Sequence, residues 1–112
     1  TSIFIISGSM KEDSEREMMY SVKLIEYNLD YSKDLNTQIE TLNPLAFSDD
    51  TRISVIDEKG KVLADTYKKD ISSNHLKREE VQQALHSSNH EGYAMRRSET
   101  TNQPLLYAAF HT

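Results

Sequence analysis

Two neighbouring arginines, Arg96 and Arg97, are the residues of this sequence best suited to bind an anionic group. They lie in a strand-like stretch, where successive side chains point to opposite faces, so at least one must face whatever covers the sheet. A buried guanidinium needs an acid, a tyrosine hydroxyl or a bound anion, because an unpaired buried charge is costly. The pair therefore predicts either an internal ion pair, the more common arrangement, or a fork that holds the carboxylate of a ligand.

The other polar residues form no motif for catalysis or metal binding. His86 and His90 are four positions apart, a zinc spacing only if both lie on one helical turn, but the serines and asparagine between them predict a helix end. His75 beside Asn74 is compatible with a polar group on a cavity or with a local turn. The chain has no cysteine and only three glycines, which leaves no thiolate ligand and no phosphate-binding loop. We predict no catalytic residue, no metal and no cofactor.

Length and charge restrict the class of protein. The 112 residues fit one domain, covering 1–112. With 13 basic against 18 acidic residues the net charge is −5, which argues against a nucleic-acid partner. The apolar run from Ile3 to Ile6 is far shorter than the roughly 20 residues that span a bilayer. Because both ends are apolar and carry no capping signal, we expect them to be cuts in a longer protein.

The stretch from Arg52 to Asp65 predicts a β-hairpin, because two β-branched runs flank the turn signal Asp57 to Gly60. Before it, residues from about 10 to 42 contain neither proline nor glycine and predict one long helix. After it we expect a short covering helix over 79–86 and strands over 93–98 and 105–110. Residues 1–10 are compatible with a short strand or with the end of a membrane helix.

The long helix carries two apolar faces. The narrow one follows 4-3-4 spacing and consists of Met18, Val22, Ile25 and Leu29. The broader one consists of Tyr20, Leu24, Tyr27, Tyr31, Leu35, Ile39 and Leu42. A helix on a single sheet buries one face, so we assign the broad face to the protein's own sheet and the narrow face to a second copy. The alternative is that the tyrosines are simply half-exposed.

Several short blocks of the sequence, in their order along the chain, resemble the extracytoplasmic PAS-like sensor region of bacterial membrane histidine kinases. Such regions are also described as single Cache or PDC domains. The resemblance is greatest to the phosphate-regulation type. The blocks are the hairpin sequence 53–65, Asn74-His75, Arg78-Glu79-Glu80-Val81, Ala84-Leu85, Gly92, Arg96-x-Ser98-x-Thr100 and Leu106-Tyr107-Ala108-Ala109. The resemblance implies an α+β, PAS-like fold in which a long N-terminal helix packs on a central antiparallel sheet. It also implies a final strand after residue 110, which we expect to be missing here. The open edge could then pair with another copy, pair with residues 3–6, or fray, and we expect association with another copy through this edge or through the long helix.

The function implied by the resemblance is signal reception on the extracytoplasmic side of a cell membrane. A small ligand, a protein or a conformational state would be relayed through membrane helices to a cytoplasmic kinase core, and this fragment would not itself be an enzyme. The family pattern places Arg96 and Ser98 on the ligand side, with Tyr107 beside them and His75 as a further candidate, and Arg97 on the other face. The runner-up is a soluble intracellular PAS-type interaction module. A small enzyme using Arg96, Tyr107 and an acid lacks a nucleophile.

Overall fold

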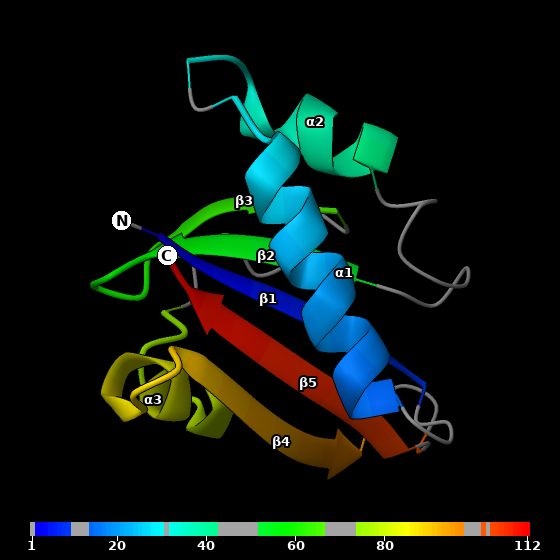
Figure 1. The fold of residues 1–112 in the computed structure, drawn as a ribbon, viewed down its shortest axis with the longest axis vertical. Helices are drawn as coiled ribbons and strands as arrows, with labels where there is room; N and C mark the ends of the chain where they lie inside the picture. Colours follow the sequence, from blue (N-terminus) through cyan, green and yellow to red (C-terminus); the bar gives the residue numbers. More distant parts are fainter. Residues whose placement is uncertain are drawn as a thin grey trace.

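A five-stranded antiparallel sheet lies at the centre of the molecule (Figure 1). The computed structural model describes residues 2–9, 14–30, 32–42, 52–66, 74–97, 102 and 104–112. Its elements are the strands β1 (Ser2–Ser9), β2 (Arg52–Asp57), β3 (Val62–Asp65), β4 (Glu91–Arg97) and β5 (Pro104–His111) and the helices α1 (Ser14–Asn28), α2 (Leu35–Leu42) and α3 (Glu79–His86). The strand order is β3-β2-β1-β5-β4, and every neighbouring pair is antiparallel. The α+β class expected from the sequence is confirmed.

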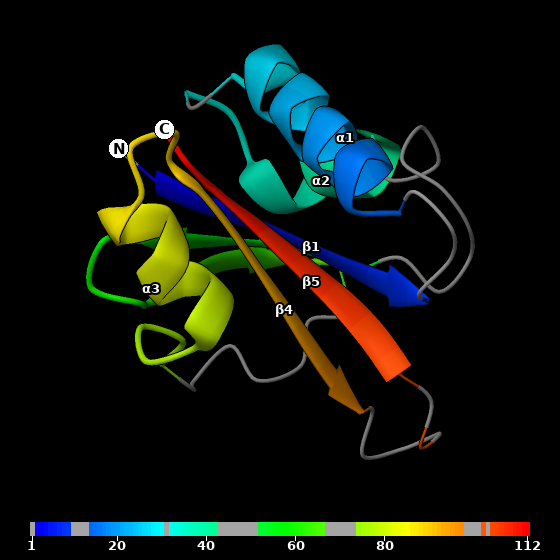
Figure 2. The same ribbon diagram turned by 60° about the horizontal axis from the view of Figure 1, so that its bottom comes forward.

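Helices cover both faces of the sheet (Figure 2): α1 and α2 lie on one face and α3 on the other. Strand β1 shows how its sequence suits this position. Phe4 and Ile6 pack into the core beneath α1 and α2, whereas Ile3 and Ile5 pack into the core beneath α3. A strand that is covered on both faces needs consecutive apolar residues, which Ile3 to Ile6 provide.

The position of β1 corrects the expectation of an open edge at the C-terminal strand. β1 lies between β2 and β5, with Ile3 opposite both Ile56 and His111. Residues 3–6 thereby pair with backbone groups that would otherwise be exposed on β2 and β5. The two chain ends also meet, because the Ser2 amide donates to the Thr112 hydroxyl over 3.0 Å and the Thr112 amide donates to the Ser2 carbonyl over 3.0 Å (Figure 1).

The single long helix predicted over 10–42 is wrong. α1 ends at Asn28 and α2 begins at Leu35. Between them the Asp30 carboxylate accepts a hydrogen bond from the Ser32 amide (3.0 Å), and the Asp34 carboxylate accepts one from the Thr37 amide (3.1 Å) at the start of α2. Asp side chains compete with the helical backbone in this way, so they end or cap helices without proline or glycine.

The structure also reverses the assignment of the two faces of α1. Met18, Val22 and Ile25 are almost completely buried against the sheet, and Leu29 packs against the same core. The exposed side chains are those of Tyr20 (70%), Leu24 (42%) and Tyr27 (85%). The narrow 4-3-4 stripe is buried because α1 lies along the sheet over β1 and β5.

The predicted hairpin, covering helix and last two strands are confirmed as β2–β3, α3, β4 and β5. In the hairpin turn the Asp57 carboxylate accepts from the amides of Lys59 and Lys61, each over 2.9 Å. Gly60 has φ +88°, which few residues with a Cβ tolerate. A β-bulge next to Val55 shifts the register of the hairpin.

Candidate functional site

A band of polar side chains crosses the α3 face of the sheet, at the end away from the two chain ends. In the strand register Ser7 lies opposite both Arg52 and Tyr107, and Ser54 lies opposite Asp65. Because side chains on one face recur at every second residue, these positions share the face of Ile3 and Ile5. Together with Arg96 on β4, every strand contributes to this polar band, which consists of Asp65, Arg52, Ser54, Ser7, Tyr107 and Arg96.

Arg96 forms an internal ion pair with Glu80 of α3. Its two terminal nitrogens donate to the two carboxylate oxygens over 2.7 Å and 2.8 Å, and the Glu80 side chain is fully buried. The guanidinium carbon also lies 3.8 Å from the ring centroid of Tyr107. Glu80 raises the pKa of Arg96, mainly through these hydrogen bonds. Of the two arrangements that the sequence left open, the structure shows the internal pair.

Gly92 allows α3 to lie close enough for this pair to form. A Cβ placed on Gly92 would lie 2.1 Å from the Glu80 carbonyl oxygen and 2.8 Å from the Ala84 nitrogen. The backbone of α3 therefore touches β4 at a point where no other residue fits. This contact puts Glu80 directly above the polar band.

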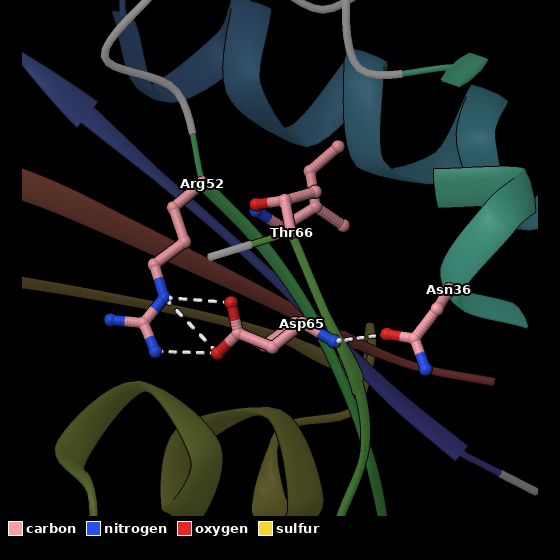
Figure 3. A network of polar contacts seen from close by, with 6 residues as sticks. Asn36, Arg52, Asp65 and Thr66 are labelled. Atoms are coloured by element: carbon pink, nitrogen blue, oxygen red, sulfur yellow. Dashed lines mark hydrogen bonds and ion pairs between the residues drawn. The ribbon is translucent and has the colours of Figure 1, made fainter. Parts of the chain in front are cut away.

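Arg52 and Asp65 form a second ion pair in the band (Figure 3). The Arg52 Nε donates to both Asp65 carboxylate oxygens, over 3.0 Å and 3.1 Å, and the Ser54 hydroxyl donates to the same carboxylate over 3.1 Å. The Asp65 amide donates to the side-chain oxygen of Asn36 over 3.2 Å. Through Asn36 the band is linked to α2 on the opposite face of the sheet.

Arg78, at the start of α3, is the third arginine of the site. Burial and the nearby charge of Arg96 both lower the pKa of Arg78. Among the described residues no carboxylate lies within ion-pair distance of its guanidinium. Among the described residues, the three arginines of the site (Arg52, Arg78, Arg96) outnumber its two acids (Asp65, Glu80) by one positive charge.

His75 is buried beside this charge. Its amide donates to the Gly60 carbonyl over 2.9 Å, and its own carbonyl accepts from the Arg78 amide over 3.1 Å. Burial, followed by the positive charge of Arg78, lowers the pKa of His75. The imidazole is therefore neutral at neutral pH.

The structure brings some of the predicted site residues together and not others. Arg96 and Tyr107 are in contact, His75 is buried beside Arg78, and Ser98 lies outside the described residues. Arg96 and Arg97 lie on opposite faces of the sheet, as strand alternation predicts, and Arg97 donates to the Asn102 carbonyl over 2.8 Å. The narrow stripe proposed for a second copy, Met18, Val22, Ile25 and Leu29, is part of the core.

Arg52, Arg78, Asp65 and Glu80 were not predicted as site residues. A signal for Glu80 was present, because Glu80 and Ala84 are four residues apart and so share the buried face of α3. In the described ranges no cluster of histidines and acids is arranged to hold a metal, and no helix is long and apolar enough to cross a membrane.

Comparison with known proteins gives no match to a family model, to a curated protein or to a solved structure.

Proposed function

We propose that this chain is the extracytoplasmic signal-receiving domain of a bacterial membrane sensor histidine kinase. The supporting observation is the polar band on the α3 face of the sheet, to which all five strands contribute, together with the excess of one positive charge that Arg78 adds among the described residues. A small carboxylate or phosphate bound at Arg78 would accept charge-assisted hydrogen bonds from a guanidinium that is partly buried. The expected binding of a small anion rests on this charge.

The same band offers a route from the ligand to the rest of the protein. Arg96 and Glu80 connect β4 with α3, while Asp65 and Asn36 connect β3 with α2. A ligand that competes for either ion pair would shift a helix relative to the sheet. In the whole sensor, membrane helices attached to β1 and β5 would receive that shift where Ser2 and Thr112 meet.

A thermal-shift experiment tests anion binding. Acetate, malate, citrate and phosphate are added to the wild type, to Arg78→Ala and to Arg97→Ala, whose side chain lies on the opposite face. A bound anion stabilises the folded protein and so raises its melting temperature. At an anion concentration 100 times Kd, the free energy of unfolding rises by about 2.7 kcal/mol. We expect a shift in the wild type and in Arg97→Ala, and its loss in Arg78→Ala. If no anion shifts the wild type, the small-anion part of the proposal is wrong.

We also propose that the domain forms a homodimer through α1, using the exposed face of Tyr20, Leu24 and Tyr27. This surface equally favours the second candidate function, a soluble intracellular interaction module. The gene around this segment separates the two, because the membrane sensor requires hydrophobic spans of about 20 residues on its flanks. The interaction module does not require such spans.

A further inference from the structure

The two edges of the sheet are protected to different degrees. At the β3 edge the Asp65 amide is bonded to Asn36, and Lys61 pairs with Asn74 in an isolated bridge. The β-bulge between β2 and β3 adds local twist. Side chains that bond edge amides and bulges that twist the edge away are the usual means of preventing unwanted strand pairing. These features protect the β3 edge at Lys61 and Asp65.

The β4 edge is closed only over its first half. The Glu91 amide donates to the Ser87 hydroxyl over 3.0 Å, and the Tyr93 amide donates to the side-chain oxygen of Gln83 over 2.9 Å. Outward-pointing amides recur at every second residue of a strand, so those of Met95 and Arg97 point the same way. Within the described residues nothing bonds them, and Met95 is 54% exposed. Among the described residues, the two amides and the two carbonyls of Met95 and Arg97 are thus without a strand partner on this side and suit an added strand.

We propose that the edge from Met95 to Arg97 binds an extended peptide segment by strand addition, with an acidic side chain opposite Arg97 and an apolar one opposite Met95. Both residues point to the α1 face, so the two peptide side chains are separated by one residue. In an antiparallel arrangement the acid comes first in the peptide, giving the order acidic, any residue, apolar. Main-chain hydrogen bonds hold the segment, and the two side chains select it.

Charge favours an acidic partner over a second copy of this chain. The Arg97 guanidinium donates to a main-chain carbonyl, and no described acid lies within ion-pair distance of it. Pairing β4 with β4 of another copy would bring Arg96 and Arg97 of both copies together. Like charges on opposing strands destabilise such a pair. An acid opposite Arg97 instead forms a cross-strand ion pair.

Binding of labelled peptides tests this site. The probe is an acetylated and amidated octapeptide, Thr-Val-Thr-Glu-Thr-Leu-Thr-Val, called the glutamate peptide. The control, called the lysine peptide, has lysine in place of glutamate. Fluorescence anisotropy is measured against the wild type, Met95→Pro, Arg97→Glu and Lys59→Glu. Met95→Pro removes an outward amide that has no partner in the sheet, so its melting temperature should stay close to that of the wild type. Lys59→Glu makes the same charge change at an exposed turn residue.

We expect the glutamate peptide to bind the wild type and Lys59→Glu at least tenfold more tightly than it binds Met95→Pro or Arg97→Glu. Arg97→Glu should prefer the lysine peptide. Equal binding to all four proteins, or no binding by the wild type at millimolar peptide, overturns the proposal. Dimerisation of the wild type that Met95→Pro abolishes would show that a second copy is the occupant, and would overturn the choice of an acidic segment.

Discussion

Glu80 is the residue on which the candidate site depends most. Its carboxylate is fully buried, and both of its oxygens accept hydrogen bonds from Arg96. A buried ion pair of this kind adds little relative to apolar residues of similar size, but removing one partner leaves a charge without compensation. The other partner, Arg96, keeps 35% of its side chain exposed, which lets water replace part of the loss.

We therefore expect Glu80→Gln to lower the free energy of unfolding by about 2 kcal/mol, less than for a fully buried pair. The matched control is Glu79→Gln, an exposed neighbour on the same helix, which should change stability by less than about 0.5 kcal/mol. Urea unfolding at pH 7 measures both. Equal effects of the two substitutions would mean that the pair is not formed in solution.

A second prediction at this scale concerns pH. Burial and the charge of Arg78 lower the pKa of His75 from 6.5, while Arg52 lowers it further and Asp65 opposes this. The unfolded chain then binds a proton at a higher pH than the folded protein does. The contribution of His75 to stability is therefore complete above pH 6.5 and is lost as the pH falls below that value.

Urea unfolding at pH 7.5 and pH 5.5 should show this loss in the wild type, and His75→Gln should show a smaller one. His86→Gln, which changes an exposed histidine, should behave like the wild type. A wild type that is equally stable at both pH values would contradict a buried neutral His75.

The candidate site could be predicted only in part. Strand alternation was enough to place Arg96 and Arg97 on opposite faces, because that rule is local. The partners of Arg96 could not be assigned, because Glu80 reaches it only after α3 has folded onto β4 at Gly92. Arg52 and Asp65 belong to one hairpin, but charged residues are common at the ends of strands. Their presence there did not by itself indicate an ion pair.

At the scale of the elements, the hairpin and α3 were predictable because their signals are local. The turn Asp57 to Gly60 marks the hairpin, and the acids in the first turn and His86 in the last turn mark α3. The break between α1 and α2 was not predicted because neither proline nor glycine marks it in the sequence. Here Asp30 and Asp34 end one helix and start the next through side-chain hydrogen bonds. The break also turns Leu35 and Ile39 back toward the core, although an unbroken helix would have placed them in the stripe of Tyr20.

The two faces of α1 give a prediction for the proposed dimer. Leu24→Glu changes the exposed face, so it should reduce self-association while leaving the melting temperature close to that of the wild type. Val22→Asp changes the buried face and should unfold the domain, because an unpaired charge in the core costs several kcal/mol. Sedimentation velocity and circular dichroism measure the two effects. A wild type that remains monomeric at high concentration would refute dimerisation through α1.

At the scale of the whole molecule, β1 joins two halves of the sheet. β1 pairs with β2 of the hairpin β2–β3 and with β5 of the pair β4–β5, and these two pairs of strands do not pair with each other. This arrangement could not be predicted from the sequence, because four apolar residues near the N-terminus do not specify which strands they will pair with. Long-range pairing depends on the complete set of strands and not on local pattern.

A chain shortened to residues 10–112 should consequently lose cooperative unfolding, since the central strand and both of its apolar faces are missing. Addition of a synthetic peptide with the sequence of residues 1–10 should restore it, because backbone groups of β2 and β5 remain available for pairing. Circular dichroism during urea titration reports both states. A shortened chain as stable as the wild type would show that β1 is dispensable.

The contact between Ser2 and Thr112 makes the molecule a candidate for circular permutation. A short linker could join residue 112 to residue 1, because the two ends already exchange hydrogen bonds. New ends opened between Ser9 and Ser14 would then give a chain that starts with α1 and finishes with β1. In this rearranged gene a helix comes first and an additional strand follows β5, which is the order that the sensor resemblance implies for its members.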